Sequence, residues 1–385
     1  MKKNLLTTAL ASVMAVTLLV GCGSSNNGSA SGDGDVIKIG GIGPLTGEAS
    51  TYGISVKEGA LLLEKEINEA GGIDGKKIQF LFEDDQADPN SSLQAFNKLV
   101  DNDKVVAILG GVTSGATLAI APNATSSKVA MLTPTGTEPT ITEVGGEYMF
   151  RGCFIDSFQG EILGEYASDN LSSKTAAVLY SAGSDYSIGI ANSFKASFEA
   201  AGGEVQEFLT YNEGDTDFKA QLTKIKGSNP DVIVLPDYYN VVGLITKQAR
   251  SMGISSQFLG GDGWESEDLV KIGGDSVDGA IYINHYYAGD ETEAVKNFVD
   301  AYTKEYGKEP DCFAALAYDS AKILAEAIDK ADSLDRTTIK DSMKSVEIES
   351  VTGKISFDEN RSAIKGASII KIEGDSKVLA DKIVR

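Results

Sequence analysis

Short apolar runs alternate with stretches of helical periodicity along most of the chain. The runs at residues 36–42, 78–82, 105–109 and 129–132 predict four strands, and the segments at 52–69, 89–102 and 115–127 predict the helices between them. Asp88 before Pro89 is typical of a helix start, and Gly71-Gly72 is typical of a helix stop. A strand–helix alternation of this kind requires a parallel sheet that is covered by helices on both faces.

The same order then repeats. Strands are predicted at 176–180, 205–209, 232–235 and 258–259, with helices at 186–201, 217–226 and 239–252. Three further helices at 292–306, 311–330 and 334–345 follow, and a hairpin-like pair at 353–357 and 367–372 closes the chain. The predicted fold class is therefore α/β, with two doubly wound parallel-sheet lobes in series.

Polar and aromatic residues occupy equivalent loops of the two repeats. The loops after first strands lead to Tyr52 and Tyr186, those after third strands hold Ser114 and Tyr238, and those after fourth strands hold Thr135, Thr137 and Asp262. In an open α/β sheet all of these loops lie at the carboxyl edge, where such folds bind ligands. Two lobes that face one another would place hydroxyls on one wall, and aromatic rings with a carboxylate on the other.

This set of groups suits a small zwitterion. The first free N–H groups of the helix after Ser114 form an anion site for a carboxylate, to which Thr137 adds a hydroxyl or N–H. Asp262, the Thr135 carbonyl and the Thr137 hydroxyl would accept from an ammonium, and Tyr52, Tyr186, Tyr238 with Phe158 or Trp264 would enclose the side chain. Each residue also has an ordinary interpretation: Ser114 as a helix N-cap, Asp262 as a turn residue, the tyrosines as buried aromatics.

The N-terminus has the pattern of an export signal. Residues 1–21 combine Lys2 and Lys3 with an apolar run too short to span a membrane, which predicts a signal peptide. The sequence Leu-Val-Gly-Cys ending at Cys22 resembles a bacterial lipobox, which implies lipid attachment at Cys22; an ordinary signal with an incidental cysteine is the alternative. Residues 22–35 are then a lipid-anchored flexible tether, and the 364 residues after the signal suffice for two domains.

Charge and composition exclude several functions. The formal net charge is −22, so nucleic acid and anionic lipid headgroups are poor partners. His285 is the single histidine, which argues against a multi-histidine metal site; we expect His285 to be structural, and we expect no catalytic residue, metal or cofactor. The glycines at 39–47 have the wrong spacing for a dinucleotide fingerprint. Cys153 and Cys312 do not form a disulfide framework, and their pairing stays open.

The chain resembles the substrate-binding proteins of branched-chain amino acid ABC transporters. The resemblance is carried by the segments GPLTGEASTYG at 43–53, INEAGGIDG at 67–75, EDD at 83–85, LTPTGT at 132–137, RGCFIDSFQG at 151–160 and QARSMG at 248–253. It implies the type 1 periplasmic-binding-protein fold, with two lobes joined by a three-stranded hinge. It also implies an extracytoplasmic, lipid-anchored monomer that closes on an amino acid and delivers it to a membrane permease without transforming it.

Carried over by position, the resemblance implies that Ser114 and Thr137 meet the ligand carboxylate, and that Thr135, Thr137 and Asp262 meet its ammonium. Tyr52, Tyr186 and Tyr238 fall where the family places pocket aromatics. In branched-chain binders the residue at the position of Asp262 is often glutamate. Ala87 and Thr113 occupy the positions where some members carry a disulfide. The family also takes up other amino acids, amides and aromatic acids.

The resemblance further implies three crossings between lobes, near 153–156, 283–287 and 353–367. Lobe one is expected to comprise residues 36–154 and 286–357, and lobe two residues 155–285 and 358–385. Two alternatives remain open from the sequence: a surface-anchored hydrolase of small amides that uses the same cleft, and a ligand-sensing receptor without transport.

Overall fold

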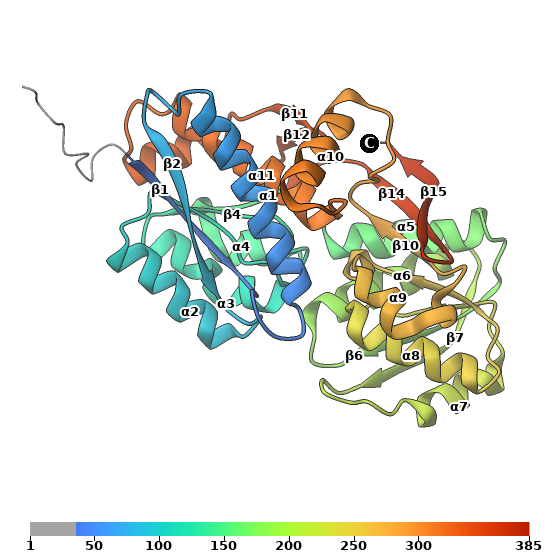
Figure 1. Ribbon diagram of the computed structural model, residues 1–385. Coiled ribbons are helices and arrows are strands. Elements are labelled where there is room, and N and C mark those ends of the chain that lie inside the picture. The colour runs from blue at the N-terminus through green and yellow to red at the C-terminus, as the bar shows by residue number, and fades with distance from the viewer. Residues whose placement is uncertain (1–35, 385) are drawn as a thin grey trace, which may run out of the picture. The chain divides into compact units, whose positions relative to one another are not determined.

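The computed structural model describes residues 36–384. The expected signal peptide, Cys22 and the tether lie outside the described residues. The first sheet has five parallel strands in the order β2-β1-β3-β4-β5 (Figure 1). These strands are β1 (Val36–Gly43), β2 (Lys77–Asp84), β3 (Ala107–Leu109), β4 (Ala130–Thr133) and β5 (Met149–Arg151).

Alternate residues of these strands point to opposite faces, and each face is covered by helices. Ile37 and Ile39 pack with α1 (Ser50–Glu69), α11 (Cys312–Lys330) and α12 (Arg336–Met343). Ile42 and Ile108 pack on the other face with α2 (Pro89–Asn97) and α3 (Ser114–Ser126). The central strands β3 and β4 are buried on both faces and are continuous apolar runs, which is why they could be predicted from sequence, whereas the edge strand β2 has exposed polar residues.

The second sheet has seven strands in the order β15-β14-β10-β9-β8-β6-β7. Five of them repeat the order of the first sheet and are parallel: β6 (Thr175–Ser181), β7 (Glu204–Tyr211), β8 (Val232–Val234), β9 (Gln257–Gly260) and β10 (Ile281–Asn284). Helices α5 (Asp156–Asp169) and α6 (Asp185–Ala200) cover one face; α7 (Lys219–Ser228), α8 (Tyr239–Ser251) and α9 (Glu267–Gly273) lie on the other. The predicted repeat of one α/β order is confirmed.

The predicted hairpin near the C-terminus is wrong. β12 (Gly353–Phe357) pairs with β11 (Ile348–Ser350) and β13 (Ala363–Ile364) in a separate antiparallel sheet. β14 (Ala367–Glu373) instead pairs with β10 and with β15 (Ser376–Ile383), both antiparallel, in the second sheet. Two apolar runs with turn residues between them look like a hairpin in sequence, but here each run completes a different sheet.

Helix α5 was not predicted, although it lies next to the site. Nine of its 14 residues are buried, and they include the polar Asp156 and Gln159 and two glycines, so the buried face is not a clear apolar stripe in the sequence. Gly160 and Gly164 let α5 approach α6 closely: a Cβ at Gly160 would lie 2.6 Å from the Ile190 carbonyl oxygen. The helix predicted at 89–102 is confirmed in its bounds, although only α2 (Pro89–Asn97) is α-helical and a π-helical turn, Lys98–Asn102, completes it.

The remaining segments join the two sheets. α10 (Glu293–Tyr306) packs on α1, where the hydroxyl of Tyr306 donates to the Glu58 carbonyl at 2.9 Å. Cys153 and Cys312 are both buried and unbridged. Among the helices of residues 36–384, none combines the length and apolar character that crossing a membrane requires.

Candidate functional site

A pocket lies where the carboxyl edges of the two parallel sheets face one another. Its cavity volume is about 10 Å³, so the lining side chains leave little free space in it. All seven residues predicted from sequence line it, together with four that the prediction did not include. The lining consists of Tyr52, Val112, Thr113, Ser114, Thr135, Thr137, Tyr186, Tyr238, Asp262, Gly263 and Phe313.

One pole of the pocket is the N-terminus of α3. Thr113 precedes the helix in extended conformation and its side chain makes no cap hydrogen bond. The buried Thr113 Oγ1 has no hydrogen-bond partner. The Ser114 Oγ accepts from the Glu138 N–H at 3.3 Å, which leaves the Ser114 hydroxyl hydrogen free. Free helix N–H groups and free hydroxyl donors together favour an anion at this pole.

The threonine hydroxyls nearby have the opposite polarity. Thr135 donates its hydroxyl hydrogen to the Val112 carbonyl at 2.7 Å. Thr137 is near the Asp156 carboxyl group, whose pKa it lowers. The Thr135 hydroxyl therefore offers its lone pairs to the pocket, as a cation requires. Thr137 can offer either its hydroxyl or its backbone N–H, so both roles that the sequence left open for this residue stay open.

Asp262 forms the second pole and is held by three donors. The Tyr186 hydroxyl and the Gln159 Nε2 donate to Oδ1 at 2.9 and 3.0 Å, and the His285 Nε2 lies 2.9 Å from Oδ2. The Gln159 Oε1 accepts from the Asp262 N–H at 2.9 Å, which fixes the orientation of the amide. The Asp262 carboxylate is thus held rigidly, and it is 3% exposed.

No acidic residue neighbours His285 in the sequence, but in the fold its ring contacts Asp262. Burial lowers the pKa of His285 to about 4, although the hydrogen bond with Asp262 acts in the opposite direction. Its ring is therefore neutral at pH 7, with Phe154 stacked on it at a centroid distance of 3.5 Å. All three donors to Asp262 are neutral, so none of them balances a charge on this carboxylate. Among residues 36–384, no cluster of side chains is suited to bind a metal ion.

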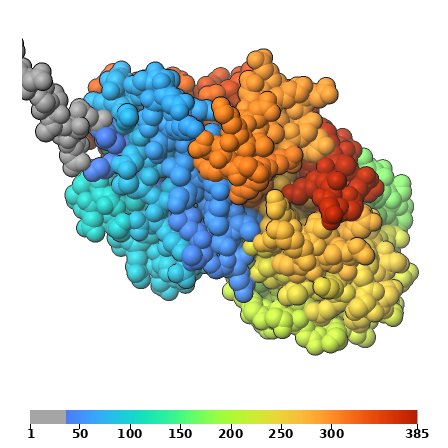
Figure 2. All heavy atoms as spheres, viewed as in Figure 1, coloured from blue at the N-terminus to red at the C-terminus, as the bar shows by residue number. Residues whose placement is uncertain are grey.

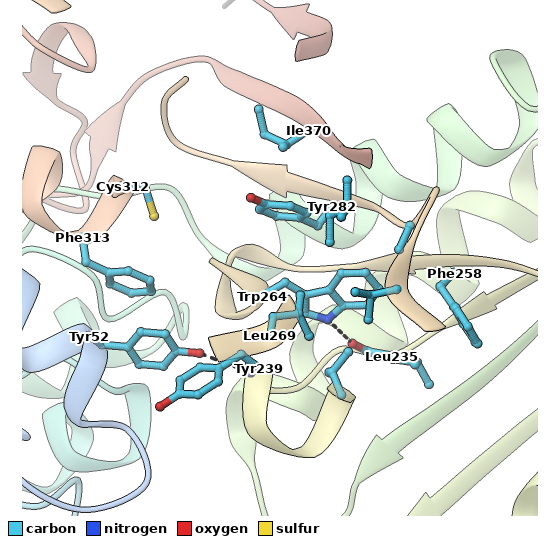
Figure 3. Packing of buried hydrophobic residues seen from close by; sticks show 14 of the residues in the cluster. Tyr52, Leu235, Tyr239, Phe258, Trp264, Leu269, Tyr282, Cys312, Phe313 and Ile370 are labelled. Atoms are coloured by element: carbon cyan, nitrogen blue, oxygen red, sulfur yellow. Dashed lines mark hydrogen bonds between the residues drawn. The ribbon is translucent and has the colours of Figure 1, made fainter. Parts of the chain in front are cut away.

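Aromatic rings form the side walls, and Tyr52 connects the two sheets. Its ring stacks on Phe313 with centroids 4.2 Å apart and meets Tyr238 edge to face at 5.5 Å. Its hydroxyl donates to the Gly263 carbonyl and accepts from the Tyr239 N–H at 3.4 Å (Figure 3). Tyr52 from α1 thus closes the pocket against residues that follow β8 and β9.

Further contacts between the two walls lie at the rim. The Tyr239 hydroxyl donates to the Glu48 carbonyl at 2.6 Å, and Asn240 Nδ2 donates to the Glu48 carboxylate at 3.0 Å. The Ser266 hydroxyl lies 3.4 Å from Thr51 Oγ1. These contacts close the pocket at its rim.

Phe158 and Trp264 do not line the pocket, contrary to expectation. Trp264 is fully buried in the core beneath it, where its Nε1 donates to the Leu235 carbonyl at 2.9 Å (Figure 3). Phe158 packs edge to face against Phe154. Val112 and Phe313 take their place. Val112 follows directly from the predicted strand end, so its position was a usable signal, whereas Phe313 comes from α11, far away in sequence.

A larger groove lies beside the pocket, between α1, α9 and α10, on the face shown in Figure 2. Its buried acid Glu265 accepts from Lys377 at 2.8 Å and from Asn284 at 3.1 Å. Asp311 accepts from the Ser55 hydroxyl at 2.5 Å and the Ala314 N–H at 2.9 Å. Glu265 therefore has a cationic partner in Lys377, whereas Asp311, like Asp262, is held by neutral donors.

Comparison with known proteins places the chain in a family. The model of the periplasmic binding protein family matches residues 36–377. The leucine-, isoleucine-, valine-, threonine- and alanine-binding protein of Pseudomonas aeruginosa is 31% identical over 325 residues, covering 84% of this chain and 86% of that protein.

Two solved structures agree. A leucine-binding protein from Thermotoga maritima superposes with a TM-score of 0.86 at 35% identity, over 90% of this chain and 99% of that one. A branched-chain amino acid transporter substrate-binding protein from Streptococcus pneumoniae, solved with isoleucine, superposes with a TM-score of 0.85 at 38% identity, over 91% and 99%. The fold is that of type 1 periplasmic binding proteins, and the chain belongs to the periplasmic binding protein family.

Proposed function

We propose that this protein captures a small amino acid, branched-chain or related, in the pocket between the two sheets. The observation that carries the proposal is the pairing of two opposite poles in one enclosed space: the uncapped N-terminus of α3, and the buried Asp262 without a cationic partner. An α-amino acid has one carboxylate and one ammonium, and so satisfies both poles at once.

Each pole has a defined set of groups. Ser114, the first N–H groups of α3 and the Thr137 N–H hold the carboxylate. Asp262, the Thr135 carbonyl and the lone pairs of the two threonine hydroxyls hold the ammonium. The rings of Tyr52, Tyr186 and Tyr238, with Val112 and Phe313, surround the side chain, so that a compact apolar side chain fits best.

Binding proceeds by closure of two lobes around a hinge. Lobe one comprises residues 36–154 and 286–357, and lobe two residues 155–285 and 358–385. Within the expected crossing at 353–367, the pairing of β13 with β12 and of β14 with β10 supports extending lobe one to residue 364 and starting the last segment of lobe two at residue 367. Ligand contacts from both walls exist together only in the closed form, so the ligand shifts the population toward it.

The ligand is not transformed. A hydrolase of small amides would need a nucleophile with a positioned base. The pocket hydroxyls of Ser114 and Thr113 have no lysine, histidine or cysteine among the lining residues. His285 lies behind Asp262 with its Nε2 engaged there.

We further propose that the chain is a monomeric lipoprotein, anchored through Cys22 outside the cytoplasm, and that it delivers its ligand to an ABC permease. The lipobox-like sequence at Cys22 and the relatives named for branched-chain amino acid binding support this role. A receptor that reports the ligand to a sensor is the rival. Permease and ATPase genes beside the coding gene would favour transport, and a kinase gene would favour sensing.

Native mass spectrometry of the protein purified with its endogenous ligand tests the ligand class directly. We expect one bound species with the mass of a small amino acid. A bound nucleotide, sugar or metal would contradict the proposal, and turnover of an amide substrate by the purified protein would favour the hydrolase.

A further inference from the structure

A second buried carboxyl group, that of Asp156, lies behind the ammonium pole. Asp156 opens α5 and is fully buried. Gln159 Nε2 donates to Asp156 Oδ1 at 3.3 Å and to Asp262 Oδ1 at 3.0 Å, so one amide is shared by two acids. Asp156 Oδ2 has no hydrogen-bond partner. This side chain is not part of the pocket lining, and the site as described above does not use its charge.

The charges around Asp156 do not balance it. The ionisable groups that face it are Arg151, Cys153, Glu138, Asp262, Tyr186 and Tyr238, with the neutral His285 beyond Asp262. Arg151 is the one cation among them, and its Nη atoms donate to the carbonyls of Thr137 and Pro139 at 2.8 and 3.1 Å. Within residues 36–384, no lysine or arginine nitrogen lies within 4.0 Å of either acid. Two buried unpaired carboxylates that share one donor are costly, so a proton or a ligand cation must compensate them.

We propose that Asp156 is a positioning residue of the ammonium pole. It holds a proton while the pocket is empty and releases it to solvent when a ligand ammonium binds at Asp262. The inference rests on the proposed function, since it requires a cationic group in the pocket.

Asp156 acts on the pocket through Thr137 and Gln159. As a carboxylate it would accept the hydroxyl hydrogen of the nearby Thr137, which would turn the Thr137 lone pairs toward the ligand. Its backbone N–H donates to the Thr137 carbonyl at 2.9 Å, which keeps the loop after β4 against α5. The ionised form of Asp156 therefore belongs with the bound ammonium, and the protonated form with the empty pocket.

Proton release from Asp156 breaks one bond. The O–H bond of the Asp156 carboxyl group breaks, its electron pair stays on the carboxylate, and the proton passes to a buffer base. The surroundings of Asp156 favour its protonated form in the empty pocket. Burial raises the pKa of Asp156 well above its ordinary value, and the charge of Asp262 raises it further, whereas Thr137 lowers it. A bound ammonium offsets the negative charge of Asp262 and therefore lowers the proton affinity of Asp156.

Infrared difference spectroscopy on the wild-type protein tests the step without any variant. The ligand-free protein at pH 7.5 is compared with the protein saturated with L-leucine, or with whichever amino acid of the standard twenty binds most tightly. We expect a carboxylic-acid C=O band that shifts in D₂O to disappear on binding. Binding without loss of such a band overturns the inference.

Calorimetry assigns the proton to a residue. Binding enthalpies measured at pH 7.5 in phosphate and in Tris give the number of protons exchanged, because the two buffers differ in ionisation enthalpy. We expect release of up to one proton per ligand in the wild type and none in Asp156→Asn. Asp85→Asn is the matched control, because Asp85 is another fully buried acid with a raised pKa that does not line the pocket.

The outcomes separate the two proposals. Loss of proton release in Asp156→Asn and its retention in Asp85→Asn support the inference. Unchanged release in Asp156→Asn overturns it, even though amino acid binding stands. If no amino acid binds the wild type, the proposed function itself fails. Should Asp156→Asn fail to fold, the wild-type infrared difference decides the matter.

Discussion

His285 Nε2 donates a hydrogen bond to Asp262 Oδ2 across 2.9 Å, and both side chains are buried. A carboxylate offers only acceptors, so the ring must carry its hydrogen on Nε2, which leaves Nδ1 bare and without a partner. The bond orients the Asp262 charge toward the pocket without neutralising it. The single histidine of the chain therefore supports the site rather than forming part of the ligand surface.

Substitution of His285 tests its neutral, supporting role through the pH dependence of the free energy of unfolding. The native pKa is about 4, below the ordinary value of 6.5, so the unfolded chain binds a proton that the native protein does not. Stability from this group is full above pH 6.5 and falls as the pH drops from 6.5 to 4, by up to about 3 kcal/mol. His285→Gln should lack this slope in urea unfolding between pH 7 and 4. Parallel curves for both proteins would contradict the assignment.

Asp85 should show the opposite sign. It accepts from the Ala87 N–H at 2.9 Å and from the Ser92 hydroxyl at 3.2 Å. Burial nonetheless raises its pKa to about 6. The native protein therefore keeps a proton that the unfolded chain loses, and stability falls as the pH rises from about 4 to 6. Asp85→Asn should remove this fall, worth about 3 kcal/mol at most. A steeper fall in the variant, measured by the same urea titrations, would show that the carboxylate is stabilised.

Ser114→Ala tests the carboxylate pole. Loss of a hydrogen bond to a charged group costs about 1.5–3 kcal/mol, or roughly 10- to 150-fold in Kd. Calorimetry with leucine should show this loss. Leucinamide, which lacks the carboxylate, should bind the variant and the wild type with similar affinity. Equal losses for both ligands would mean that Ser114 serves only as part of the helix start.

Tyr52→Phe tests closure. The variant keeps the stack on Phe313 and loses the hydroxyl that donates to the Gly263 carbonyl on the other wall. A hydrogen bond of this kind contributes about 0.5–1.5 kcal/mol, so ligand dissociation should accelerate roughly 2- to 12-fold. The association rate should change little, since the bond forms only after closure. Stopped-flow fluorescence separates the two rates, and a change confined to association would contradict the assigned role.

The fold was largely predictable because its strands are buried on both faces. Runs such as Val129–Leu132 are apolar throughout, and helix stops such as Gly71-Gly72 separate the elements. Where the pattern was weak, the prediction failed. Helix α5 buries polar residues and glycines among its apolar ones, and the short strands β5 and β10 have three and four residues. The pairing of β12 and β14 depended on distant partners that local sequence does not reveal.

The site was predictable in its lining but not in its support. Tyr52, Ser114 and Asp262 follow strand ends, so the parallel topology brings them to one pocket. Gln159 and Asp156 come from the unpredicted helix α5. His285 follows β10, which was also missed, and its contact with Asp262 bridges 23 residues. Supporting residues of this kind have no positional rule, because any neighbouring element can supply them.

The central claim is that Asp262 binds the ammonium of an amino acid. Its most direct test is calorimetry of wild type and Asp262→Asn with two ligands of the same shape, leucine and 4-methylpentanoate, which lacks the amine. We predict that Asp262→Asn weakens leucine binding by at least about 2 kcal/mol, roughly 30-fold, because the ammonium loses its one charged partner. Binding of 4-methylpentanoate should change less than about threefold. Equal losses for the two ligands, or no loss for leucine, would contradict the account.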